Sequence, residues 1–192
     1  MPSLAFQVWE TERQTSLDEM EEAHARMGGT GPGRRVTTQQ INRAYAVLLS
    51  SQFQGFCRDL HDECVRNLTD SVASPELREI FRGALEEHRQ LDRGNPHPGA
   101  IGADFKRFDI PFWSEVENRD ARTGIRQRYL RELNEWRNAI AHQDFDAIRL
   151  GGSTVLQLRV IRDWRRGLRA LANSFDEVMR VHLQSILGTS PW

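Results

Sequence analysis

The sequence predicts an all-α protein, an up-and-down bundle of helices with an N-terminal helical arm. Apolar residues recur at spacings of three and four along most of its 192 residues, as they do in helices with one buried face. Turn-forming segments rich in glycine and proline separate these stretches. No stretch shows a convincing strand pattern. We therefore expect several helices packed around one core.

The first predicted element is an acidic amphipathic helix over residues 4–27. It is followed by Gly28-Gly29-Thr30-Gly31-Pro32-Gly33, a run that neither a helix nor a strand tolerates. Residues 1–33 are therefore expected to be a helical arm and linker that packs on the domain or on a second copy. Residues 34–192 are expected to form the bundle domain.

Four long helices are predicted within the bundle domain. The first runs from about residue 37 to 69, capped by Thr37 or Thr38. The second starts behind Ser74-Pro75, a cap followed by proline at the first helical position. The residues that recur at helical spacing along it are Leu77, Ile80, Phe81, Leu85 and His88. The last two helices cover residues 119–142 and 156–187. The expected buried stripe of the helix over residues 119–142 consists of Ile125, Tyr129, Leu133, Trp136 and Ile140.

Residues 101–118 are rich in aromatic side chains and less regular in their spacing. We expect them to fill the core and close one end of the bundle, with a short helix after Pro111.

Charge and cysteine content limit the possible settings of the protein. The net charge is -1, so no global basic field indicates a nucleic-acid partner. Cys57 and Cys64 would lie on one helix face about 10 Å apart, too far for a disulfide. That spacing favours a reducing, cytoplasmic compartment. We find no stretch of transmembrane length and no secretion signal, so no membrane association is expected.

The remaining polar residues give weaker indications. His61, His88 and His182 are expected to be structural, and His97 lies in a proline-rich loop. None has metal-ligand spacing, so neither a metal nor a cofactor is predicted. Arginines 162, 165, 166 and 169 of the last helix either bind phosphates or form a solvated face.

The most informative segment is Glu135-Trp136-Arg137-Asn138-Ala139-Ile140-Ala141-His142. Successive helical residues are about 100° apart, so Asn138 and His142 are surface neighbours on one flank with Arg137. Histidine can take a proton from a ribose 2′-hydroxyl, and arginine can stabilise the phosphorane-like transition state. Asn138 would orient the phosphate or the histidine. The simpler alternatives are that His142 interacts with the last helix carbonyls and that Arg137 pairs with Glu135 or Asp144.

The segment Arg137-Asn138-Ala139-Ile140-Ala141-His142 resembles the Arg-x4-6-His signature of the HEPN superfamily. Residues 43–56 look like the first core helix of prokaryotic HEPN proteins, and the likeness covers about residues 37–187. It implies a helical bundle that cleaves RNA without a metal, with Arg137, Asn138 and His142 as catalytic residues. It also implies a homodimer acting as a toxin or antiphage-defence effector, with an antitoxin or defence protein as partner. A non-catalytic HEPN-like module that dimerises or binds a nucleotide or a protein is the alternative.

Overall fold

The computed structural model describes residues 1–27 and 34–192, and side chains of the second range from Val36 onward. The predicted linker lies outside the described residues. Within the described ranges the chain forms helices and no strand, which confirms the all-α prediction. The main helices are α1 (Leu4–Val8), α2 (Gln14–Met27), α3 (Arg34–Asp70), α4 (Pro75–Glu86), α5 (Pro98–Phe105), α6 (Phe112–Arg119), α7 (Thr123–His142) and α8 (Leu158–Leu187).

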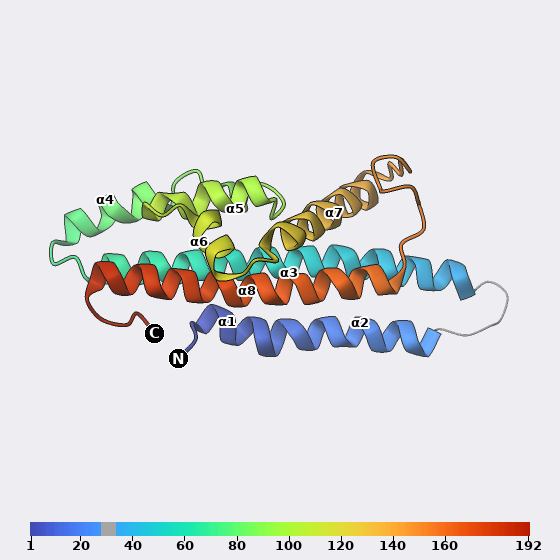
Figure 1. Cartoon of the computed structure of the whole chain (residues 1–192), viewed down its shortest axis with the longest axis horizontal. Coiled ribbons are helices and arrows are strands. Elements are labelled where there is room, and N and C mark those ends of the chain that lie inside the picture. The colour runs from blue at the N-terminus through green and yellow to red at the C-terminus, as the bar shows by residue number, and fades with distance from the viewer. Residues whose placement is uncertain (28–33) are drawn as a thin grey trace.

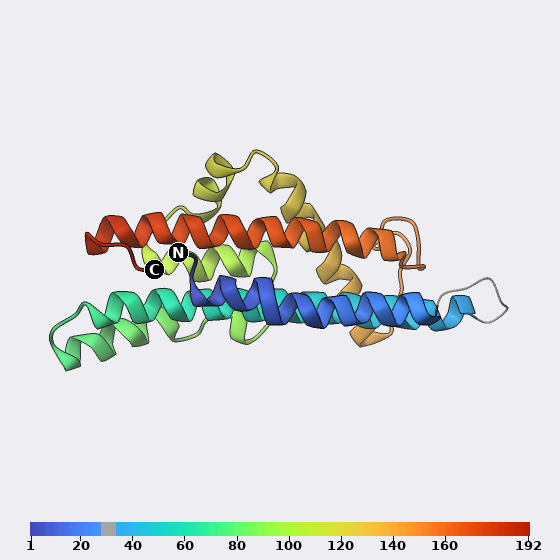
Figure 2. The same ribbon diagram turned by 90° about the horizontal axis from the view of Figure 1, so that it is seen from below.

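Two long helices form the centre of the bundle. Helices α3 and α8 lie side by side, with α1 and α2 along one side of the pair and α4 to α7 along the other (Figure 1). Chain direction alternates through α2, α3, α7 and α8, as in an up-and-down bundle. Helix α7 is tilted against the central pair and crosses it (Figure 2). Among the described helices, none combines the length and the apolar character needed to span a bilayer.

The N-terminal helical segment shares the main core of the protein. A π-helical turn over Trp9–Arg13 joins α1 to α2 and carries the fully buried Trp9. The indole ring centroid lies 5.7 Å from that of Phe53 and 5.6 Å from that of Phe56, both on α3. Leu17 is fully buried as well. Residues 4–27 are therefore packed into the bundle along their length.

Two carboxylates of the central helices hold the start of α1. The amide of Ser3 donates to Asp176 Oδ1 at 3.1 Å, and the amides of Leu4 and Ala5 donate to the two carboxylate oxygens of Glu63 at 3.0 and 2.9 Å. These bonds satisfy amides that a helix start leaves without intrahelical partners.

The predicted cap of the long central helix is wrong. Helix α3 begins at Arg34, three residues before Thr37. Residues 34–36 contain neither glycine nor proline, so nothing in their covalent structure opposes a helix there. The threonines consequently lie inside the first turns.

Helix α4 begins as predicted but exposes its apolar stripe. Ser74 Oγ accepts the amide of Leu77 at 3.3 Å, which confirms the cap. The side chains of Leu77, Ile80 and Phe81 are 49%, 64% and 50% exposed, however. Helix α4 packs on α3 through another face, and it ends at Glu86, before the exposed His88.

The aromatic segment packs into the core, as predicted. It packs on Phe175, in the middle turns of α8, so the prediction that it closes one end of the bundle is not confirmed. The ring of Phe105 stacks on that of Phe112 with centroids 4.4 Å apart, and the Phe112 ring lies 4.9 Å from Phe175 of α8. The predicted helix after Pro111 is α6.

His61 of α3 is a fully buried histidine next to this aromatic cluster. Its ring centroid is 4.8 Å from that of Phe108, and its Nδ1 lies 3.3 Å from Nη1 of Arg89. Burial and the Arg89 guanidinium together lower the pKa of His61 from 6.5 to about 3. His61 is therefore neutral in the folded protein at neutral pH.

This pKa makes the fold sensitive to acid. The unfolded chain binds a proton at His61 below about pH 6.5 while the folded chain does not, so stability is lost as the pH falls from 6.5 towards 3. We expect a loss of about 2 kcal/mol at pH 5 from this residue. The free energy of unfolding should be measured from pH 7 to pH 5 in the wild type and in His61→Gln, which does not titrate. Parallel pH profiles for the two proteins would contradict this assignment.

Candidate functional site

The candidate site lies at the carboxyl end of α7, where the chain leaves the helix abruptly. Gln143 adopts a left-handed conformation with φ 53° and ψ 32°, and the amide of Asp144 donates to the carbonyl of Ala139 at 3.0 Å. This is a typical helix stop. It makes His142 the last helical residue and leaves its side chain exposed.

Arg137 and Asn138 are brought together on the partly buried flank of α7. Arg137 Nη1 donates to Asn138 Oδ1 at 3.4 Å, and Asn95 Nδ2 donates to the same oxygen at 2.6 Å. Both contacts use the Asn138 oxygen, so its amide nitrogen is free of hydrogen bonds to any described residue. An arginine and an amide nitrogen thus offer donors side by side.

The loop that carries Asn95 is fixed to both α3 and α7. Gln54 Nε2 donates to the carbonyls of Leu91 and Gly94, both at 2.6 Å, and Asn134 Nδ2 donates to the carbonyl of Pro96 at 3.1 Å. Asn95 is not predictable as a site residue from the sequence, because a Gly-Asn-Pro turn carries no signal for a contact 43 residues away. This loop holds the Asn138 side chain in one orientation.

The ion pairs considered as an alternative for Arg137 are not formed. Glu135 and Asp144 both pair with Arg149 instead, at 3.5 and 3.0 Å. Within the described ranges, Arg137 pairs with no carboxylate. Its charge is therefore available to an anion from outside the chain.

His142 forms no hydrogen bond with either of the other two predicted site residues. Its side chain forms no hydrogen bond or ion pair with the described part of the chain, and Gln143 Nε2 donates to the Ile140 carbonyl at 2.8 Å in its place. The alternative that His142 bonds the last carbonyls is thus not realised. The structure places Arg137 and Asn138 together and leaves His142 free one turn beyond Asn138.

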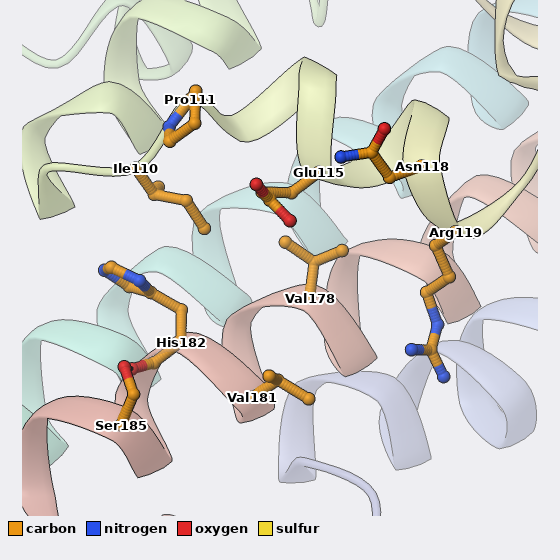
Figure 3. Close-up of a pocket in the computed structure, with 9 residues that line it drawn as sticks. All are labelled: Ile110, Pro111, Glu115, Asn118, Arg119, Val178, Val181, His182 and Ser185. Atoms are coloured by element: carbon orange, nitrogen blue, oxygen red, sulfur yellow. Dashed lines mark hydrogen bonds between the residues drawn. The ribbon is translucent and has the colours of Figure 1, made fainter.

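None of these three residues lines the main grooves of the described chain, although one groove is lined by the adjacent Glu135 and Trp136. One groove of about 440 Å³ lies between α6 and α8, with Glu115 on one wall and His182 on the other (Figure 3). His182 Nε2 contacts the Phe108 carbonyl at 2.8 Å, as a structural histidine does. Across the described residues, no group of three or more His, Cys, Asp or Glu side chains is arranged to hold a metal ion.

Three of the four α8 arginines are engaged by the acidic N-terminal segment. Arg162 Nε donates to Glu21 at 2.8 Å, Arg165 Nη2 to Asp18 at 2.7 Å, and Arg169 Nε to Glu10 at 2.9 Å. Those carboxylates occupy the positions that phosphates would take. Arg166 is the exception, because it bonds only Asp163 of its own helix.

Comparison of the chain with protein-family models, with curated proteins and with solved structures found no match.

Proposed function

We propose that the protein is a metal-independent endoribonuclease of the HEPN type, with Arg137, Asn138 and His142 as its catalytic residues. The observation that carries the proposal is the unpaired Arg137, held beside the Asn138 amide on the helix end that exposes His142. A partly buried arginine without a carboxylate partner is suited to bind a phosphodiester.

Each residue has a defined role in the proposed reaction. His142 takes the proton of a ribose 2′-hydroxyl, whose oxygen attacks the adjacent phosphorus. The bond from phosphorus to the 5′-oxygen breaks, which leaves a 2′,3′-cyclic phosphate and a 5′-hydroxyl end. Arg137 stabilises the added negative charge, and the Asn138 amide orients a phosphate oxygen.

The proposal includes a homodimer. The leaving 5′-oxygen needs a proton, and no histidine of the described chain other than His142 is placed at the site by a hydrogen bond to Arg137 or Asn138. A second copy of the site would supply that acid. A role as a cytoplasmic toxin or antiphage-defence effector, restrained by an antitoxin or defence partner, follows from the same resemblance.

The test is cleavage of end-labelled single-stranded RNA in excess EDTA. Wild type is expected to cleave and to leave 2′,3′-cyclic phosphate ends, while DNA of the same sequence stays intact. His142→Ala is expected to lower the rate by about a hundred- to ten-thousand-fold, as loss of a general base does. His24→Ala is the matched control, because His24 lies on α2 and makes no hydrogen bond with the described residues. A folded His142→Ala variant that cuts like wild type would overturn the proposal.

A second candidate function is a non-catalytic HEPN-like module that dimerises or binds a nucleotide or protein. The lack of any hydrogen bond between His142 and Arg137 or Asn138 in the described chain favours it, since the three side chains are not linked to one another. This candidate predicts RNA binding or self-association in sedimentation experiments with no turnover in the cleavage assay.

A further inference from the structure

A second groove, of about 470 Å³, lies between the start of α7 and the middle of α8. It has no part in the proposed catalytic site. Its lining consists of Arg122, Ile125, Arg126, Tyr129, Asp163, Arg166 and Gly167. Three arginines and an aromatic ring thus surround one groove.

The groove is positively charged. The Arg122 guanidinium pairs with no carboxylate of the described chain, whereas Arg126 bonds Asp120 and Arg166 bonds Asp163. Three guanidinium groups thus outnumber the two carboxylates that face them. Arg166 is also largely exposed, and its only partner lies three residues away on its own helix. Surface pairs of this kind contribute little free energy, so the arginine can turn to another anion.

The start of α7 adds to this charge. No side chain caps the helix, whose first residue is Thr123, and Arg122 occupies the capping position. The amides of Arg122 and Thr123 donate to the side chain and the carbonyl of Asp120, which leaves the next two amides, of Gly124 and Ile125, at the positive end of the helix. They would support the arginines in holding an anion at this end of the groove.

The opposite part of the groove is lined by the apolar side chain of Ile125 and the ring of Tyr129. The Tyr129 ring lies against α8 where Gly167 has no side chain, and a Cβ atom at Gly167 would be 2.8 Å from Tyr129 Cδ2. Ile125, predicted as part of the buried stripe, is half exposed beside this ring. A partly exposed aromatic ring is a surface on which a nucleic-acid base can stack.

We propose that this groove binds a nucleotide unit, with its phosphate at Arg122 and Arg166 and its base against Tyr129 and Ile125. Arg126 is eleven residues from Arg137, about 16 Å along the helix, so the groove is separate from the catalytic site. The nucleotide belongs to an RNA strand or is free in solution. The inference that the nucleotide is part of an RNA strand rests on the proposed function. The inference that the groove binds a nucleotide rests only on the residues that line it.

The test is binding of a fluorescent 12-nucleotide RNA with 2′-O-methyl groups, which cannot be cleaved by 2′-hydroxyl attack, and separately of AMP. Arg122→Gln with Arg166→Gln is expected to weaken binding about ten-fold and to reduce the salt dependence of RNA binding. Tyr129→Leu is expected to weaken binding about ten-fold at unchanged salt dependence. Arg128→Gln is the control, because Arg128 lies on α7 outside the groove lining and pairs with Glu132.

The outcomes separate this proposal from the proposed function. Sensitivity of RNA binding alone identifies a strand subsite, and equal sensitivity of AMP binding identifies a free nucleotide site. Either result supports the groove even if the wild type cleaves no RNA, in which case only the nuclease proposal fails. Unchanged binding of both ligands in the double arginine variant, or no binding of either by wild type, would overturn the groove assignment.

Discussion

Replacing Arg137 by alanine is expected to lower the rate of RNA cleavage by about a hundred- to thousand-fold without unfolding the protein. Removal of one preorganised donor to a developing charge has an effect of this size. Arg137 has no carboxylate partner in the described chain, so the variant leaves no acidic side chain unpaired. Single-turnover rates in EDTA measure the effect directly.

The choice of variants distinguishes transition-state stabilisation from general attraction to RNA. Arg137→Lys keeps the charge but loses the planar pair of donors, so we expect an intermediate rate. Arg128→Ala removes the same charge from an exposed part of α7 and is expected to leave the rate within about two-fold, since exposed ion pairs contribute little. A rate for Arg137→Ala equal to that of Arg128→Ala would contradict the role given to Arg137.

The parts of the fold that local chemistry determines were predictable from the sequence. Ser74 followed by Pro75 sets the start of α4, because the hydroxyl accepts an amide and proline has none to donate. The aromatic residues around Pro111 correctly indicated buried core positions, although not their place along the bundle. In both cases the residues that form the feature are close together in the sequence.

Features that depend on distant partners were not predictable in the same way. The pair of Arg169 with Glu10 joins residues 159 positions apart, and no pattern within α8 indicates it. Periodicity identifies an apolar stripe on α4, but it does not say whether Leu77, Ile80 and Phe81 meet another helix or solvent. At the candidate site, helical geometry predicted that Arg137, Asn138 and His142 share one flank of the helix, whereas the contact from Asn95 required the folded loop.

Replacing Trp9 by alanine is expected to destabilise the protein by about 3 to 5 kcal/mol. Trp9 is fully buried against Phe53 and Phe56, and a large aromatic side chain removed from a packed core leaves a cavity that relaxes only in part. Urea unfolding followed by circular dichroism measures this loss as a shift of the midpoint at constant slope.

Leu4→Ala provides the matched control for this prediction. Leu4 lies in the same helical segment but is 59% exposed, so its truncation is expected to cost less than about 0.5 kcal/mol. A large effect of Trp9→Ala together with a small effect of Leu4→Ala would mean that residues 4–27 fold as part of the bundle. A loss below about 1 kcal/mol in Trp9→Ala would instead mean that the segment adds little to the core. Glu10, Asp18 and Glu21 would then be held only weakly against α8, and the α8 arginines that they bond could exchange these carboxylates for phosphates.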